Sequence, residues 1–312
     1  MPNAPTVAVF TTNADVTADY VVRELSERGV RVFRCDPGDF PAKVTLAARS
    51  GECWTGRLDA GGRSLAIEDV VCAWWRRPSR IEPVPLVAEP DWSVREARAG
   101  FYGLMSVLPW LNHPDDIRRA EHKPLQLAVA AAVGLSVPPT LLTNDPDEVR
   151  AFAEEHGALI YKPLCSGGLS DHRMIYASRV ALDAVDDAVR LTAHLFQPEI
   201  VKDHELRVTL VDGRPFVARI DAASDVGRRD WRADYPSLTY TPVELPPPVL
   251  GKLRAYAQRM RLRFLAADII VTPAGDYVFL EANPNGQWAW IEDATGLPIA
   301  AAIADALEGR TP

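Results

Sequence analysis

The stretch Tyr277–Trp288 places a carboxylate and an amide two residues apart at the end of an apolar run, and this feature constrains the chain most. Side chains at positions i and i+2 of a β-strand lie on the same face. Glu281 and Asn283 therefore point in one direction, and Val278 and Leu280 are expected on the opposite, core-facing side. The stretch predicts a strand that ends in two oxygen donors.

A second apolar run, Ala266–Val271, lies just upstream and contains one acidic residue, Asp268. Residues 272–276 between the two runs carry the proline and glycine of a hairpin turn. If the turn centres on Ala274 and Gly275, Asp268 stands opposite Glu281. Magnesium takes oxygen ligands and completes its shell with waters or phosphates, so this incomplete set predicts a metal held jointly with a nucleotide.

An alternative reading of the same residues is purely structural. A glutamate at a strand end is commonly solvated, and an aspartate in an apolar strand is commonly hydrogen-bonded to nearby backbone. The hairpin alone favours this plainer interpretation. Motifs elsewhere in the chain are needed to choose between a metal site and a purely structural hairpin.

The length, net charge and cysteine content of the chain exclude several classes of protein. A chain of 312 residues exceeds the usual single core, so two or three lobes are expected. The net charge of -8 argues against a nucleic-acid partner. No apolar stretch is long enough to span a membrane, and no signal segment opens the chain. The four cysteines lie far apart without a C-x-x-C pair, so neither a zinc site nor a disulfide framework is indicated, and a reducing cytoplasm is the simplest location.

The first third of the chain predicts an α/β lobe. Thr6–Thr11 and Val30–Arg34 flank a helix over Asp15–Arg28, with Gly29 as its stop and Val16, Val22 and Leu25 as candidate inward positions. This βαβ opening lacks G-x-G-x-x-G, so no dinucleotide is assigned. Further strands are expected over 43–58, 64–67 and 71–75, separated by Gly51 and by Gly61-Gly62. A helix follows over 91–108, and its candidate buried side chains are Trp92, Ala99, Tyr102 and Val107.

Arg76 and Arg77 follow an apolar strand directly before a proline. Guanidinium groups suit carboxylates, so one interpretation is that both contact an acidic substrate at the mouth of a cleft. The other is that they pair with local acids on the surface. The sequence leaves both open.

The middle of the chain carries a second candidate site. Residues 117–133 read as a helix that Pro124 bends or restarts, with Lys123 at the break. Residues 145–157 have the cap, proline and terminal glycine of a helix. A strand then ends on Lys162 before the loop Ser166–Gly168, an arrangement suited to phosphate, although such a loop alone is more often a hairpin. A further helix is expected over about 182–191.

The last third predicts a second antiparallel sheet. Strands over 205–211 and 215–221 are joined by Asp212–Arg214, a strong hairpin signal, and Arg219 shares a face with Asp221. Residues 230–232 lie in a charged loop. Residues 242–248 form a proline-rich connector into a helix over 249–262.

This order of motifs resembles the ATP-grasp superfamily. The resemblance covers about residues 114–308 and implies an α/β and α+β architecture, the ATP-grasp fold with an N-terminal Rossmann-like pre-ATP-grasp domain. It divides the chain into residues 1–113, a substrate-side domain, residues 114–194, a central lobe, and residues 195–312, a lobe with the metal hairpin. ATP and Mg²⁺ are the implied cofactors.

The resemblance also implies roles for single residues. Lys123 and Lys162 match the lysines that contact ATP phosphates, and Arg219 matches the cationic residue near the transferred phosphoryl group. Arg232 is a further candidate for contact with the phosphates. The remaining matches are the adenine hinge around Gln197, Glu199 and Ile200, the ribose-binding Glu205, and the magnesium ligands Asp268, Glu281 and Asn283. Pro198 departs from the family because it removes a backbone donor from the hinge.

A closer resemblance runs nearly end to end. Trp75–Ser79, Glu121–Pro124, Thr143–Pro146, Asp230–Arg232 and above all Glu281–Trp288 are similar to segments of the ATP-grasp ribosomal peptide maturases, the graspetide synthetases that include the microviridin-type macrocyclases. Members of that family join Asp or Glu side chains of a precursor peptide to hydroxyl or amine groups. The resemblance implies a precursor peptide, with a leader and an acidic core, as partner, and it implies a homodimer, although no interface signature is visible.

The resemblance leaves other reactions open. A ligase that adds amino acids to a peptide or protein end, and a phosphotransferase on the same fold, use the same nucleotide site. Asn285 and Gln287 follow the metal strand at the place where an acceptor peptide would approach, so both are candidate substrate-side residues. A purely structural turn fits them equally well.

Overall fold

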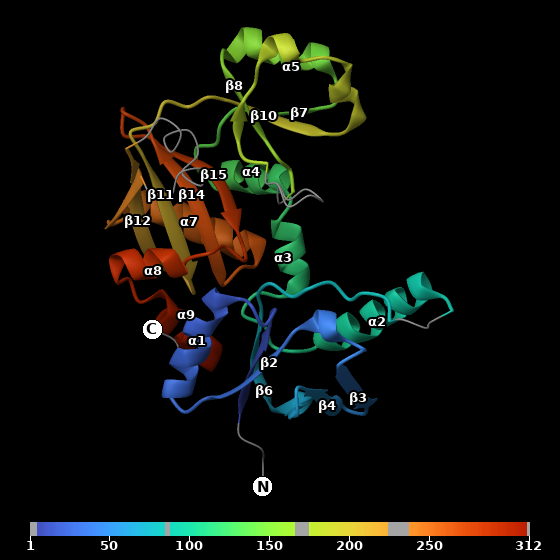
Figure 1. Cartoon of the computed structure of the whole chain (residues 1–312). Coiled ribbons are helices and arrows are strands. Elements are labelled where there is room, and N and C mark those ends of the chain that lie inside the picture. The colour runs from blue at the N-terminus through green and yellow to red at the C-terminus, as the bar shows by residue number, and fades with distance from the viewer. Residues whose placement is uncertain (1–4, 85–87, 166–174, 224–236, 311–312) are drawn as a thin grey trace.

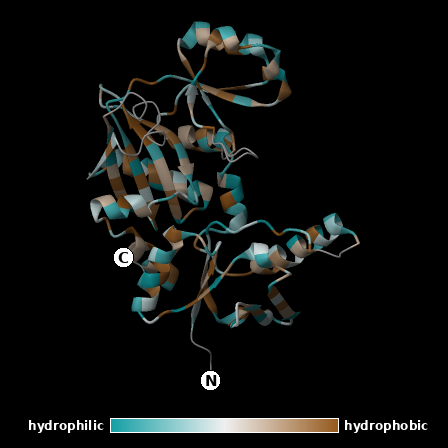
Figure 2. Ribbon diagram, in the orientation of Figure 1, coloured by the Kyte–Doolittle hydropathy of each residue, from teal (hydrophilic) through white to brown (hydrophobic). Residues whose placement is uncertain are grey.

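The computed structural model describes residues 5–84, 88–165, 175–223 and 237–310. Figure 1 shows three sheet-containing parts, with the first part of the chain below, the middle part above, and the last part between them. In Figure 2, apolar residues follow the strands, and the outward turns of α1 and α5 are hydrophilic. None of the helices in the described ranges is long and apolar enough to cross a membrane.

The N-terminal part opens with the predicted βαβ unit. Strand β1 (Thr6–Phe10) pairs in parallel with β2 (Arg31–Cys35) and β6 (Val70–Trp75), and helix α1 (Val16–Glu27) connects the first two. The Asp15 carboxylate accepts the N–H of Ala18 and caps the helix. Val16, expected to face inward, is 65% exposed because the buried face of the helix is formed by Thr17, Ala18, Val21 and Leu25.

A second, antiparallel sheet completes this part. It consists of β3 (Val44–Ser50), β4 (Trp54–Ala60) and β5 (Arg63–Ala66). These strands lie where the sequence predicts them.

Helix α2 (Pro90–Met105) packs with a different face from the predicted one. None of the four candidate side chains is fully buried, and Trp92 and Val107 are 56% and 52% exposed. Phe101 and Met105, four residues apart, fill the core instead, and the Phe101 ring meets Phe10 edge-on. The expected inward face of this helix was therefore wrong.

Two helices lead out of the N-terminal part, as the proline predicts. Helix α3 (Pro114–Ala120) ends before α4 (Lys123–Ala132), whose first turn contains Pro124. Leu127 and Ala130 of α4 are buried against the sheet formed by the end of the chain. The boundaries 1–113, 114–194 and 195–312 remain a prediction, and by packing α4 belongs with the last part.

The central sheet has the order β7-β10-β8-β9. Its strands are β7 (Leu141–Thr143), β8 (Leu159–Lys162), β9 (Ser178–Arg179) and β10 (His194–Pro198), and helix α5 (Pro146–His156) covers it (Figure 1). The helix expected over 182–191 is replaced by two short 3₁₀ turns, Leu182–Ala184 and Asp187–Leu191. The reason is Asp186, whose extended backbone interrupts the helix and whose side chain caps the second turn through the N–H of Ala188.

The last sheet is antiparallel, with the order β13-β12-β11-β14-β15. Its strands are β11 (His204–Val211), β12 (Arg214–Ala222), β13 (Leu238–Pro242), β14 (Phe264–Val271) and β15 (Tyr277–Asn283). Asp212 and Gly213 both have positive φ, which is the two-residue hairpin turn that the sequence predicts between β11 and β12.

The two faces of this sheet have different neighbours. Helix α7 (Pro247–Met260) and α4 cover one face, over a core that includes Leu206 and Ile269. At the other face the last helices, α8 (Ala289–Thr295) and α9 (Ile299–Glu308), join a core with α1 and β1. Helix α9 thereby brings the end of the chain back against the N-terminal part (Figure 1).

Candidate active site

The two predicted carboxylates face each other across β14 and β15. Asp268 pairs with Glu281 in the register that the sequence predicts. The register shifts by one residue between Asp268 and Ile269, so a bulge at Leu280 interrupts the alternation of β15. As a result Phe279 and Ala282 fill the core, and Leu280, expected there, is only half-buried.

Each carboxylate holds a cation from another element. Arg207 Nη1 of β11 lies 2.7 Å from Asp268 Oδ1, and both side chains are buried. Lys123 Nζ, from the first turn of α4, lies 2.9 Å from Glu281 Oε2. The two cations therefore compensate the charges of Asp268 and Glu281. Burial of these carboxylates without a partner would cost a large amount of folding free energy.

Arg207 is a residue that the sequence reasoning missed. It stands opposite Asp268 across β11 and β14, and its Nη2 also donates to the carbonyl of Gln287 at 2.8 Å. The available signal was its spacing, because Glu205 and Arg207 are two apart and share a face of the same strand. The same spacing relates Glu281 and Asn283.

The turn after β15 is ordered by its own side chains. Asn283 Oδ1 accepts the N–H of Asn285 at 2.8 Å, and the N–H of Gly286 donates to the Asn283 carbonyl at 3.2 Å. A Cβ at Gly286 would lie 2.3 Å from Ala266 Cβ and 2.8 Å from Arg207 Nη2. Only glycine allows the turn to approach β14 and Arg207 this closely.

The donor set fits magnesium only as part of a shared site. Within the described ranges no group of three His, Cys, Asp or Glu side chains could hold a metal alone. Asp268, Glu281 and Asn283 offer two carboxylates and one amide at the end of one hairpin. Oxygen ligands in an incomplete set suit a cation that takes its remaining ligands from phosphate and water.

The predicted adenine hinge connects the two sheets. Gln197 is 3% exposed and its Nε2 donates to Thr140 Oγ1 at 2.9 Å. The backbone N–H of Glu199 donates to the Ala158 carbonyl at 2.8 Å, and the Glu199 carboxylate lies 3.3 Å from Arg179. Ile200 is half-buried at the exit of β10.

A cavity of about 500 Å³ lies at one end of the last sheet, and its lining begins at Lys202, two residues after Ile200. Its lining includes Glu205, Lys202, Arg219 and Asp221. Glu205 is buried and contacts Lys202. Lys162 is the last residue of β8, opposite Leu195, and is half-buried.

Arg219 lies on the other face of the sheet from the carboxylates. It stands opposite Leu206, whereas Arg207 stands opposite Ala218. Its guanidinium is bidentate to Asp221, with both distances 2.7 Å, and this ion pair lowers the pKa of the Asp221 carboxyl. The structure thus places Arg219 at the cavity and does not bring it to Asp268. Arg232 lies outside the described residues.

Arg76 requires a correction. It was expected at an open cleft, but it is 1% exposed, and its Nη2 donates to Gln287 Oε1 at 2.6 Å. Its Nη1 donates to the Asn285 carbonyl, and burial lowers the pKa of the guanidinium. Arg76 therefore fixes the turn after β15 to the N-terminal part. Arg77, in contrast, is exposed.

Comparison with known proteins gives matches along most of the chain. Residues 6–120 match the MvdD pre-ATP grasp domain family, and residues 127–233 match the ATP-grasp domain family of prokaryotic glutathione synthetases. A glutathione synthetase of Rhodopseudomonas palustris is 31% identical over 214 residues, which are 64% of this chain and 64% of the synthetase. The chain thus matches less than two thirds of that relative's length.

Solved structures match over nearly the whole chain. The RiPP-associated ATP-grasp ligase of Chryseobacterium gregarium, in complex with ADP and a leader and core peptide, is 26% identical with a TM-score of 0.89, over 98% of this chain and 97% of that one. The macrocyclase MdnB of Microcystis aeruginosa is 31% identical with a TM-score of 0.79, over 98% of this chain and 99% of its own. The chain therefore belongs to the ATP-grasp superfamily and, within it, to the ATP-grasp ribosomal peptide maturases.

Proposed function

We propose that this protein is an ATP-dependent ligase that activates Asp or Glu side chains of a ribosomal precursor peptide and joins them to hydroxyl or amine groups of the same peptide. The observation that carries the proposal is the patch of Asp268 and Glu281, held by Arg207 and Lys123. It lies in a chain similar over its whole length to a ligase solved with ADP, a leader and a core peptide.

The chemistry needs two steps. A carboxylate is a poor acyl donor, so one carboxylate oxygen attacks the γ-phosphorus of ATP, and ADP leaves. The acyl phosphate is then attacked at its carbonyl carbon by the hydroxyl or amine, phosphate leaves, and the nucleophile loses a proton. Each ester or amide formed inside the peptide removes one water from its mass.

The protein's part in these steps is to position groups and to neutralise charge. Lys123 and Lys162 are assigned to the ATP phosphates, and Glu205 to the ribose hydroxyls. Glu199 and Ile200 of the hinge are assigned to the adenine. Arg219 and Arg232 remain candidates for contact with the phosphates, and Arg219 lines the cavity beside Glu205.

Asp268, Glu281 and Asn283 would hold Mg²⁺. When bound, the ion supplies positive charge beside the phosphates. On the substrate side, Asn285 Oδ1 is buried without a hydrogen-bond partner among the described residues, which supports a contact with a bound molecule. Arg77 follows Arg76, which contacts the Asn285 carbonyl, and we assign this exposed cation to the substrate side as well.

The proposal is tested with Glu281→Gln and Lys162→Ala. Loss of a preorganised charge of this kind costs about 3 kcal/mol of barrier or more, so each variant is expected to lower peptide-dependent ADP formation by at least about a hundredfold. The measurement is ADP release with ATP, Mg²⁺ and the acidic peptide encoded beside the protein. Unchanged thermal unfolding is the control for folding, and wild-type turnover in either variant would contradict the assignment.

A second candidate is a ligase that adds a free amino acid to a peptide or protein end. The observation in its favour is the match of residues 127–233 to the glutathione synthetase ATP-grasp family. Such a reaction makes the peptide heavier, whereas an internal link makes it lighter by one water. A phosphotransferase on the same fold would leave phosphate on the peptide.

A further inference from the structure

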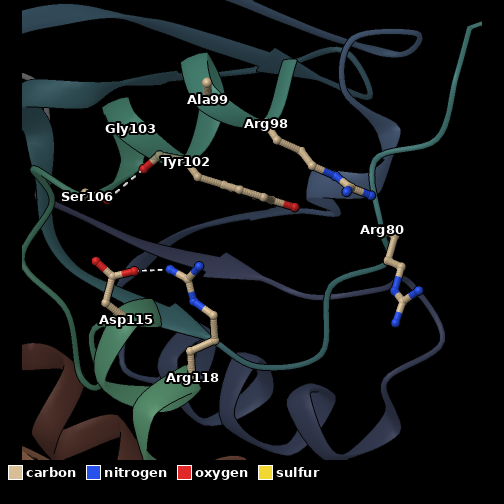
Figure 3. A pocket seen from close by; sticks show the side chains of 8 residues that line it. All are labelled: Arg80, Arg98, Ala99, Tyr102, Gly103, Ser106, Asp115 and Arg118. Atoms are coloured by element: carbon tan, nitrogen blue, oxygen red, sulfur yellow. Dashed lines mark hydrogen bonds and ion pairs between the residues drawn. The ribbon is translucent and has the colours of Figure 1, made fainter. Parts of the chain in front are cut away.

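A second hollow lies in the N-terminal part, away from the residues assigned above (Figure 3). It encloses about 620 Å³, is open to solvent, and lies between α2, α3 and the segment 76–81. Its lining is mainly cationic or polar and consists of Arg80, Arg98, Tyr102, Ser106, Asp115 and Arg118, with Ala99 and Gly103. We call this hollow the arginine pocket.

The arginine pocket has an excess of positive charge. Three guanidinium groups line it against a single carboxylate, Asp115, which is already paired with Arg118. Arg98 donates one bond to the Ile81 carbonyl at 3.2 Å. Within the described ranges, Arg80 has neither a hydrogen bond nor an ion pair.

The cations surround a phenol. Figure 3 shows Tyr102 reaching across the pocket between Arg98 and Arg118, with its hydroxyl directed toward the side that holds Arg80. Burial and the charge of Asp36 raise the pKa of this phenol, and the charges of Arg98 and Arg118 oppose that rise. The hydroxyl therefore stays protonated at neutral pH and can donate to an acceptor in the pocket.

The segment 76–81 connects this pocket to the candidate active site. It is held at one end by the bond from the Arg76 N–H to the Phe10 carbonyl, at 3.0 Å, and further along by the bond from the Ser79 N–H to Asp36 Oδ1, at 2.9 Å. Arg77 and Arg80 are its exposed cations. Arg77 and Arg80 are three residues apart, and three residues of extended chain span at most roughly 10 Å. A bound peptide of a few residues can therefore reach from one cation to the other.

We propose that the arginine pocket binds carboxylate side chains of an acidic peptide substrate, at residues other than the one being activated. The inference rests on the proposed function, which supplies the peptide. The guanidinium groups come from three elements around an open hollow, which suits several carboxylates along a chain better than one compact anion. The whole chain carries a net charge of -8, so a local cationic surface is what an acidic peptide needs to approach it.

The first test is the triple variant Arg80→Gln/Arg98→Gln/Arg118→Gln. Each exposed charge contributes about two- to fivefold in affinity, so KM for the precursor peptide is expected to rise by about tenfold or more while kcat stays within about twofold. Arg95→Gln, an exposed α2 residue outside the pocket, is the matched control and is expected to leave KM unchanged. An unchanged KM in the triple variant overturns the pocket while leaving the proposed function intact.

A single variant guards against misfolding. Among the described residues Arg80 has no hydrogen-bond or ion-pair partner, so Arg80→Glu removes no such interaction yet reverses a charge of the pocket. We expect KM to rise by about fivefold or more in Arg80→Glu. We also expect the triple Arg→Lys variant, which keeps the charges, to retain most of the wild-type affinity. Equal KM values in Arg80→Glu and wild type contradict the proposal.

The pocket is also testable without turnover. Fluorescence anisotropy with labelled hexaglutamate and hexaglutamine peptides measures binding directly. We expect only hexaglutamate to bind, with an affinity that falls as salt rises and is lost in the triple Gln variant. Equal binding of both peptides, or binding that the triple variant retains, overturns the inference even if the wild-type protein forms no crosslinked product.

Discussion

Arg207 is the residue on which the candidate site is built. It holds Asp268 through one nitrogen and the Gln287 carbonyl through another, so it fixes a predicted metal ligand and the turn after β15 at the same time. Arg76, in the N-terminal part, donates a hydrogen bond to the Gln287 side chain of the same turn. Two arginines from opposite sides therefore set where the end of β15 lies.

The Arg207–Asp268 pair predicts a coupled loss of stability. Arg207→Met leaves a buried carboxylate without this partner and is expected to lower the free energy of unfolding by about 3–5 kcal/mol. The double variant Arg207→Met/Asp268→Leu is expected to lose less than Arg207→Met alone. Urea unfolding measures both values.

The control for this cycle is an exposed pair. Arg57 lies 2.7 Å from Asp59 on β4, and Arg57→Met is expected to change stability by less than about 1 kcal/mol. Additive losses in the Arg207/Asp268 cycle would mean that the two side chains do not stabilise each other.

Arg76 illustrates what sequence alone cannot decide at this scale. Its residue type suits a carboxylate, and the sequence left a surface pair as the alternative. Its actual partners, Asn285 and Gln287, lie far along the chain and meet it only after folding. Burial of a charged side chain is set by such long-range contacts and not by its neighbours in sequence.

At the scale of elements, the hairpin of β14 and β15 could be predicted because its information is local. The turn residues and the alternation of apolar and polar positions fix the pairing of Asp268 with Glu281, and the structure confirms it. The bulge at Leu280 could not be predicted in this way. With the bulge, Phe279 and Ala282 both pack into the core beneath α7 while Glu281 still lies opposite Asp268.

Gly286 makes the close approach of this turn testable. Gly286→Ala is expected to lower stability by about 1–3 kcal/mol and to lower kcat, because the added Cβ meets Ala266 and Arg207. Gly251→Ala in α7 is the control, since nothing lies within 4 Å of its added Cβ. That change is expected to stabilise the protein by about 0.5–1 kcal/mol.

Thermal unfolding and peptide-dependent ADP release measure these two variants. If Gly286→Ala is as stable and as active as wild type, the packing of the turn on Arg207 does not matter to the site.

Two helical regions could not be predicted correctly from the sequence. The inward face of α2 and the 3₁₀ turns over 182–191 are decided by packing and by the Asp186 cap, which weak apolar periodicity does not reveal.

In the whole molecule, the end of the chain packs against its beginning. Helix α9 packs against α1 and β6, so the last helix completes the core of the first part. Asn112 adds to this closure, because its side chain binds the backbone of Phe264 and Pro284. These contacts hold the N-terminal part beside the hairpin of β14 and β15, and no local sequence pattern predicts them.

The mass of the precursor peptide after reaction decides whether the protein forms ester or amide links inside that peptide. The purified protein is incubated with ATP, Mg²⁺ and the acidic peptide encoded beside it, and the peptide is weighed by mass spectrometry with the Glu281→Gln variant as control. We expect the peptide to become lighter by one or more waters, only when ATP is present and only with the wild-type protein. A peptide that gains an amino acid or a phosphate, or one unchanged in mass while ADP forms, would contradict it.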